Sequence, residues 1–215
     1  MQLALVRHGE TIWTAENRYA GSTDIPLSPR GQQQAEQLGK WAARAGLDGI
    51  WVSPSLRTRQ TATPAERATG IAVRVDARLR EIHYGQGEGL TLEEMAQAFP
   101  EKFAGYQSDP VAHHMPGGED PRDVAQRGFE CFSEIERTYL EGRVLVVSHN
   151  TLIRATLCRL LGLPLSQYRA AFSRVGNAAL TEIQLKNGCA SLLYFNLPLD
   201  PGYPEKVDDE GRRAV

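Results

Sequence analysis

Five residues from four distant segments of the sequence have side chains that the cleavage of a phosphate ester requires: Arg7, His8, Arg57, Glu81 and His149. Such a reaction needs a nucleophile, positive charge around the transferred phosphoryl oxygens, and an acid for the leaving alcohol. A histidine can be the nucleophile, and arginine holds phosphate oxygens in a planar fork. A carboxylic acid can supply the proton. The set therefore contains every group that this chemistry needs without a metal ion.

The elements that must position these residues can be read from the pattern of apolar residues. Short apolar runs predict strands at residues 3–6, 49–53, 72–75 and 143–148. Helical periodicity or helix-start signals predict helices at residues 28–44, from about 55, at 119–139 and at 150–161. Strands that alternate with helices indicate a mostly parallel sheet covered by helices on both faces. An Asn-Gly turn at 187–188 predicts a late hairpin, which adds an antiparallel edge strand. The predicted fold is thus a three-layer α/β/α sandwich.

The carboxyl ends of parallel strands are where such folds bind ligands. His8 and His149 follow two of the predicted strands, so both should open onto this edge. Each residue taken singly also has an ordinary structural interpretation. Arg57 could form a solvated pair with Arg59, and Glu81 could pair with Arg78 or Arg80 on the surface. The coincidence of several such groups at strand ends favours an active site.

Composition limits the classes of protein to which the chain can belong. Its 215 residues, 41% hydrophobic and 23% charged, suit one globular domain with a full-sized core. A formal net charge of −2 gives no reason to expect a nucleic-acid partner. No apolar run approaches the roughly 20 residues of a membrane helix, and the first strand is too short for a signal-peptide core. A cytoplasmic protein without a membrane partner is expected.

The predicted domain spans residues 1–197, and the tail at 198–215, rich in Pro, Gly and acidic residues, is expected to be flexible. Within the domain, residues 79–121 are irregular and rich in Gly and Pro, which is typical of an inserted lid. The three cysteines, Cys131, Cys158 and Cys189, show no metal-binding spacing, and the first two are expected to be small buried side chains.

The segment Leu5-Val6-Arg7-His8-Gly9-Glu10-Thr11 resembles the Arg-His-Gly signature of the histidine phosphatase superfamily, also called the phosphoglycerate mutase-like family. The resemblance continues in the family's order. It includes residues 24–35, 53–62, 79–89, 116–119 and 146–149. One such motif is a weak signal, whereas several in the right order on the expected elements are specific. The resemblance covers roughly residues 3–195.

This resemblance implies a role for each of the five residues. His8 would attack phosphorus and become a phosphohistidine, and Arg7, Arg57 and His149 would hold the phosphoryl oxygens. Glu81 would protonate the leaving oxygen and then help to deprotonate the hydrolytic water. No metal and no cofactor is implied. The expected product is free phosphate from a small phosphorylated metabolite, which makes the chain a hydrolase of phosphoric monoesters.

Further residues are expected to contact the substrate: Thr14, Gly21, Ser22, Thr23, Tyr84 and Asn150. Thr14 stands where the family commonly has Asn, and Asn150 stands where Gly is usual after the second histidine. His83, His113 and His114 are additional candidate contacts in the irregular segment. The adjacent His113 and His114 do not suggest a metal site, because their side chains should diverge.

Three other functions remain as alternatives. A phosphoglycerate mutase would return the phosphoryl group to a second hydroxyl, but the Trp and Asn that typically precede the acidic motif of such mutases are absent before Glu81. A non-catalytic phospho-ligand binder would be expected to lack the nucleophile or the acid. A nucleotide-binding domain is disfavoured because Gly85-x-Gly87-x-Gly89 lacks the required glycine spacing. The sequence does not determine the oligomeric state, although relatives often form homodimers.

Overall fold

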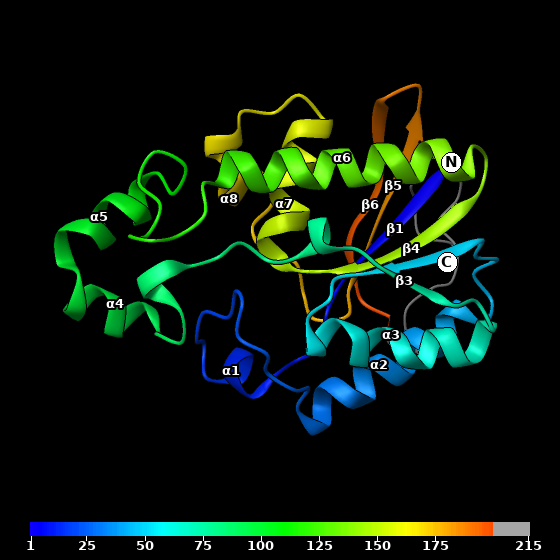
Figure 1. The fold of residues 1–215 in the computed structure, drawn as a ribbon, viewed down its shortest axis with the longest axis horizontal. Coiled ribbons are helices and arrows are strands. Elements are labelled where there is room, and N and C mark those ends of the chain that lie inside the picture. The colour runs from blue at the N-terminus through cyan, green and yellow to red at the C-terminus, as the bar shows by residue number, and fades with distance from the viewer. Residues whose placement is uncertain (200–215) are drawn as a thin grey trace, which may run out of the picture.

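The computed structural model describes residues 1–199. Within them, six strands form one sheet in the order β3-β2-β4-β1-β5-β6 (Figure 1). Their bounds are β1 (Gln2–Arg7), β2 (Gly49–Val52), β3 (Val73–Val75), β4 (Arg143–Ser148), β5 (Leu180–Lys186) and β6 (Cys189–Leu197). The first four strands are mutually parallel. β5 runs antiparallel to β1, and the edge strand β6 runs antiparallel to β5. The predicted sheet with an antiparallel edge strand is confirmed.

The helices that cover the sheet come from four segments of the chain. α2 (Pro29–Ala42) and α3 (Leu56–Thr69) pack against each other on one face, and α6 (Pro121–Tyr139) and α7 (Asn150–Leu160) cover the other (Figure 1). The short helices are α1 (Ile12–Ala15), α4 (Leu92–Ala98), α5 (Pro100–Ser108) and α8 (Tyr168–Ala171). Three single turns are η1 (Ala77–Leu79), η2 (Gly85–Gly87) and η3 (Leu165–Gln167). This arrangement is the predicted three-layer α/β/α sandwich.

Strand β1 shows why the sheet needs two helical layers. Successive side chains of a strand point to opposite faces. Leu3 and Leu5 therefore enter the core shared with α6 and α7, whereas Ala4 and Val6 enter the core shared with α2 and α3. All four side chains are fully buried. A strand that is apolar on both faces is stable only when both faces are covered, as in central strands of parallel sheets.

The irregular segment 79–121 begins in the main core with Leu79 and Ile82 and then forms a lobe beside the sandwich, which carries α4 and α5 (Figure 1). A small core of its own contains Met95, Tyr106 and Met115. Helix α4 begins with a capping box, in which Thr91 and Glu94 each bond the other's backbone N–H. The lid function of this segment stays a prediction. Most of the predicted flexible tail, from residue 200 on, lies outside the described residues.

Several local expectations are met and a few are corrected. Ser28 caps α2 as predicted by accepting a hydrogen bond from the N–H of Gly31, but this helix ends at Ala42 rather than near 44. Helix α6 begins at Pro121 rather than at 119, because Asp120 serves as its N-cap. Cys131 and Cys158 are buried thiols, as expected. No helix within residues 1–199 is both long and apolar enough to cross a membrane.

Candidate active site

His8 and His149 lie side by side at the carboxyl ends of two neighbouring strands. β1 and β4 are paired so that Arg7 stands opposite Ser148, and the next residue of each strand is a histidine. The backbone N–H of His8 donates to the carbonyl oxygen of Ser148 at 3.0 Å. The two ring centroids are 5.3 Å apart, with the rings edge to face. The structure thus brings together two predicted site residues from opposite ends of the chain.

The imidazole of His8 is held in one orientation. Its Nδ1 atom is 2.7 Å from the carbonyl oxygen of Gly9. Because a carbonyl oxygen only accepts hydrogen bonds, Nδ1 must carry the proton, and the neutral ring then has its lone pair on Nε2. Burial, together with the charges of Arg7 and Arg57, lowers the pKa of His8 well below 6.5. His8 is therefore a neutral imidazole with a nucleophilic Nε2.

Three nitrogen atoms around His8 are buried and have no hydrogen-bond partner among residues 1–199. They are Nε of Arg7, Nε of Arg57 and Nδ1 of His149. Buried polar atoms in proteins are almost always paired. Several unpaired nitrogens on different elements, two of them on cations, indicate a place where an anion binds.

The guanidinium groups of Arg7 and Arg57 are held in place by backbone carbonyl oxygens. Arg7 donates from Nη1 to the carbonyl oxygen of Val175 at 2.8 Å. Arg57 donates to the carbonyl oxygens of Thr23 at 2.9 Å and Gly21 at 2.8 Å. Burial and the neighbouring charge of Arg174 lower the pKa of Arg7 to about 10. Positive charge is thus concentrated and immobilised beside His8. Arg57 is fully buried, so the alternative of a solvated surface arginine is wrong.

Glu81 lies at the N-terminus of α7, close to both histidines. Its carboxylate accepts backbone N–H groups from Thr151 at 3.0 Å, Leu152 at 3.1 Å and its neighbour Ile82 at 2.9 Å. Burial raises the pKa of Glu81, although these hydrogen bonds oppose the shift. A carboxyl group with a raised pKa holds a proton more readily and is suited to general acid catalysis. Arg78, suggested as a surface partner, instead pairs with Asp76 and Glu134.

A cavity of about 470 Å³ opens in front of His8. Besides Arg7, His8 and Glu81, three other predicted residues line it: Thr14, Tyr84 and Asn150. The hydroxyl of Tyr84 lies 2.9 Å from Oγ1 of Thr151, which holds the tyrosine against α7. Asn150 uses its Oδ1 to accept the backbone N–H of Val175 at 3.1 Å. The side chain of Asn150 thus anchors the loop that holds Arg7.

Gly21, Ser22 and Thr23 do not line the cavity in front of His8, and their contact with substrate stays a prediction. Gly21 and Ser22 line a second hollow of about 510 Å³, which Glu81 also borders. The backbone N–H groups of Gly21 and Thr23 bond the carboxylate of Glu88 at 2.9–3.0 Å, and their carbonyl oxygens bind Arg57. This loop therefore positions Arg57, and it is itself held by Glu88.

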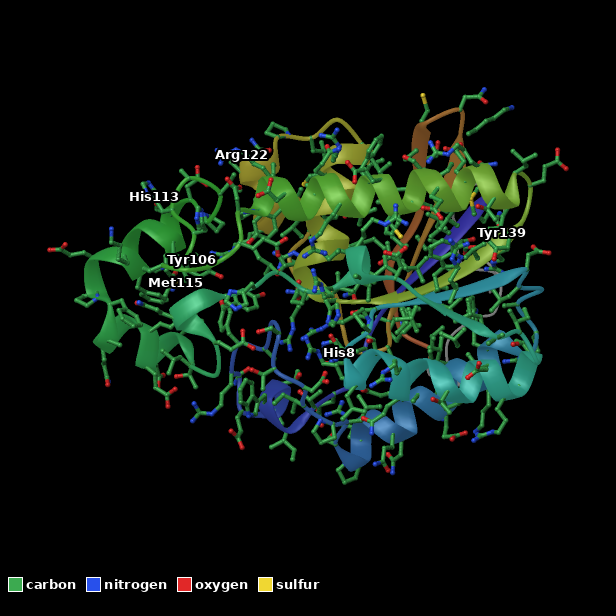
Figure 2. All side chains as sticks on the ribbon, viewed as in Figure 1. His8, Tyr106, His113, Met115, Arg122 and Tyr139 are labelled. Atoms are coloured by element: carbon green, nitrogen blue, oxygen red, sulfur yellow. The ribbon has the colours of Figure 1, made fainter. Side chains whose placement is uncertain are left out.

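The three histidines of the irregular segment lie outside the main cavity. His83 lines the second hollow, where its Nδ1 is 3.1 Å from the carbonyl oxygen of Gly117. His113 and His114 are exposed. Figure 2 shows His113 on the lobe beside α5, whereas His8 lies in the middle of the molecule. The expectation that His113 and His114 contact substrate is not supported, because neither borders a cavity described above.

Several residues in or next to the cavity wall were not predicted from the sequence: Ser53, Arg154, Tyr168, Arg169 and Arg174. Four of them line the cavity, and Ser53 lies behind it, with its Oγ 2.8 Å from Nε2 of His149. Arg154 could have been found, because it follows Asn150 by four residues and so shares its helix face. Arg174 lies in a loop and carries no comparable signal. No group of three or more His, Cys, Asp or Glu side chains within residues 1–199 is arranged to hold a metal ion.

Known proteins resemble this chain over most of its length. Phosphoserine phosphatase 1 from Hydrogenobacter thermophilus is 36% identical over 168 residues, which cover 78% of this chain and 80% of that protein. A protein named probable phosphoglycerate mutase GpmB, from Citrobacter koseri, is 34% identical, with 76% of each chain covered.

Solved structures show the same fold. Bacillus stearothermophilus YhfR superposes with a TM-score of 0.85 at 31% identity, over 91% of this chain and 96% of that one. A mycobacterial glucosyl-3-phosphoglycerate phosphatase in complex with VO3 gives a TM-score of 0.84 at 29% identity, over 91% of this chain and 99% of that one. The family description "Histidine phosphatase superfamily (branch 1)" matches residues 3–198. With this match and the geometry around His8, the chain belongs to the histidine phosphatase superfamily.

Proposed function

We propose that this protein is a metal-independent phosphomonoester phosphatase that works through a phosphohistidine at His8. The observation that carries the proposal is a neutral His8, with its lone pair on Nε2, beside three buried unpaired nitrogens from Arg7, Arg57 and His149. This arrangement offers a nucleophile and an anion site at one place. Oriented donors that already surround the developing charge are the main source of rate acceleration in such sites.

In the first step, Nε2 of His8 attacks phosphorus while the bond from phosphorus to the leaving oxygen breaks. The leaving oxygen takes the electron pair of that bond and a proton from the Glu81 carboxyl. The positive charge that develops on the imidazole is stabilised by the Nδ1–H hydrogen bond to the carbonyl oxygen of Gly9. The raised pKa of Glu81 favours the protonated carboxyl that this step requires.

In the second step, water hydrolyses the phosphohistidine. Glu81, now a carboxylate, accepts a proton from the water, and the water oxygen attacks phosphorus as the phosphorus–nitrogen bond breaks. The electron pair of that bond returns to Nε2 of His8, and inorganic phosphate leaves. Arg7, Arg57 and His149 hold the phosphoryl oxygens in both steps, so that no metal ion is needed for charge stabilisation.

The proposed substrate is a small phosphorylated metabolite, in keeping with the size of the cavity. The names of the relatives point to different reactions, including phosphoserine hydrolysis and phosphoglycerate mutation. The mutase alternative is therefore kept for testing. A phosphatase frees inorganic phosphate from its monoester, whereas a mutase only moves the phosphoryl group within its substrate. The expected cytoplasmic location and the question of a homodimer stay predictions.

The test is a panel of phosphomonoesters assayed for free phosphate in the presence of a metal chelator. We expect turnover with chelator, loss of turnover in His8→Ala, and normal turnover in the control His114→Ala, whose histidine is exposed on the lobe. Rapid quenching with labelled substrate should trap an acid-labile, base-stable phosphoenzyme that His8→Ala does not form. Strict dependence on added metal, or undiminished activity of His8→Ala, would contradict the mechanism. Binding of phosphate without any turnover would support the non-catalytic alternative.

A further inference from the structure

Arg154 is a buried cation that the proposed mechanism does not use. It lies on α7 and lines the cavity, with only 6% of its surface exposed. Its Nε atom is buried without a partner, and its guanidinium makes no hydrogen bond or ion pair with any other residue in the range 1–199. Its contact is with the ring of Tyr168, whose centroid is 5.0 Å away. An unpaired buried charge is costly, and it is normally kept for a ligand or a partner of opposite charge.

The charges of the cavity wall are strongly unbalanced. Among the described residues that line it, five are arginines and one, Glu81, carries a carboxylate. The arginines are Arg7, Arg18, Arg154, Arg169 and Arg174. Arg18 is neutralised by Glu16 and Glu94, with which it forms ion pairs. The others have no carboxylate partner in the range 1–199.

A phosphoryl group on His8 does not account for this excess of positive charge. Arg7 and Arg57 are the arginines beside His8. Burial and the positive charge of Arg169 lower the pKa of Arg154, which indicates that the two guanidinium groups are neighbours. Arg169 donates to the carbonyl oxygen of Tyr106 and to the hydroxyl of Tyr168. Tyr168 thus contacts both arginines, and the pair forms a second cationic region in the same cavity.

We infer that Arg154 binds a second anionic group on the leaving alcohol of the substrate. The inference rests on the proposed phosphatase function and names its substrate class, which is monoesters whose alcohol carries a carboxylate or a further phosphate. A guanidinium binds either group through two parallel hydrogen bonds. Arg169 and Arg174 add positive charge on the same wall. Arg154 therefore determines specificity, whereas the residues around His8 recognise the phosphoryl group that is transferred.

The experiment compares substrates that differ in the second anion. The comparison of 3-phosphoglycerate with glycerol 3-phosphate tests for recognition of a carboxylate. The comparison of fructose 1,6-bisphosphate with fructose 6-phosphate tests for recognition of a second phosphate. We expect the wild-type protein to prefer the anionic member of at least one pair. Arg154→Met should lower kcat/KM for that member by roughly 10- to 100-fold, the range for loss of a hydrogen-bonded charge pair. Its kcat/KM for the other member should change little.

Two further variants make the test specific. Arg154→Lys keeps the charge without the planar fork and should retain part of the preference. Arg159→Met is the matched control, because Arg159 also lies on α7 but is exposed and stacks on Phe129 instead of lining the cavity. It should leave the preference unchanged. Since the guanidinium of Arg154 has no ion-pair partner in the described chain, the melting temperature of Arg154→Met should equal or exceed that of the wild type.

The failure of this inference differs from a failure of the proposed function. A protein that hydrolyses no monoester refutes the phosphatase. A phosphatase with the same kcat/KM for both members of each substrate pair refutes only the role of Arg154. The role is also refuted if Arg154→Met lowers the melting temperature and leaves the anion preference unchanged, because Arg154 would then serve to stabilise the fold through Tyr168.

Discussion

Nε2 of His149 lies 2.8 Å from Oγ of Ser53, and the opposite ring nitrogen, Nδ1, is buried without a partner in the described chain. Ser53 directly follows β2, so a third strand end contributes to the site. When the serine hydroxyl donates to Nε2, the proton of the neutral ring resides on Nδ1. His149 can then donate to a phosphoryl oxygen while it stays uncharged. Ser53 is thus a positioning residue that acts through His149.

Removal of this hydroxyl tests its positioning role. In Ser53→Ala we expect kcat to fall by about tenfold, because His149 no longer has a fixed tautomer, and a neutral hydrogen bond contributes about 1 kcal/mol. Ser53→Thr should restore most of the rate. The nitrogen chemical shifts of His149 should report a mixture of tautomers in Ser53→Ala and a single tautomer in the wild type. Unchanged shifts would show that Ser53 serves packing alone.

The acid role of Glu81 predicts how the rate depends on pH. Because burial raises the pKa of Glu81 above 4.5, its protonated form persists to higher pH than that of an exposed carboxyl. The basic limb of the pH profile for kcat/KM should follow this ionisation. Glu81→Gln should remove that limb and slow hydrolysis of alkyl phosphates by 10²- to 10⁴-fold. Esters with a good leaving group, such as p-nitrophenyl phosphate, should be affected much less. An equal loss for both kinds of ester would contradict the assignment of Glu81 as the acid.

The buried histidines predict that the ligand-free protein loses stability in acid. Burial lowers the pKa of both His8 and His149 well below 6.5, so below that pH the unfolded chain binds protons that the folded protein does not. As the pH decreases below 6.5, the free energy of unfolding therefore decreases by up to about 1.4 kcal/mol per pH unit for each histidine. Glu81 opposes this loss above pH 4.5, because its raised pKa makes the folded state the better proton acceptor.

Urea unfolding between pH 5 and 7 measures this dependence. His8→Asn should reduce the slope of stability against pH, because one of the two contributions is removed. His114→Asn is the control, since this histidine is exposed. Inorganic phosphate should also flatten the slope, because an anion beside the histidines favours their protonated forms. A slope that is the same in all variants would mean that neither histidine is held neutral.

The side chain of Asn150 is connected to Arg7 through the backbone of Val175, so its removal should affect Arg7. Its Oδ1 accepts the N–H of Val175, and the carbonyl oxygen of Val175 accepts from Arg7. In Asn150→Ala the loop at 175 loses one anchor, and Arg7 becomes less well fixed. We expect KM to rise by about 3- to 10-fold, which corresponds to about 0.5–1.5 kcal/mol for one hydrogen bond. Steady-state kinetics and the affinity for phosphate measure the change. Asn177→Ala, which removes a different bond to the carbonyl oxygen of His8, is a useful comparison.

The sequence was sufficient to predict the edge of the sheet on which the site lies. Apolar runs at β1 and β4 are strong local signals, and parallel pairing necessarily places His8 and His149 at the same end. The bonding partners of side chains were not predictable in the same way. That Asn150 would bind Val175, or that Gly21 and Thr23 would hold Arg57, depends on contacts between segments far apart in the chain. Helix periodicity could have placed Arg154 on the same face as Asn150, but its buried Nε without a hydrogen-bond partner in the described chain is a feature that only the structure shows.

The pairing of β1 with β4 also determines when the protein can become catalytically active during synthesis and refolding. His8 emerges from the ribosome well before His149, its neighbour in the folded protein. The two rings can meet only once these distant strands have joined, and contacts between such distant segments form slowly. The return of catalytic activity should therefore lag behind the return of helix signal in a refolding experiment. Enzymatic turnover would thus be a selective reporter of the last long-range step in folding.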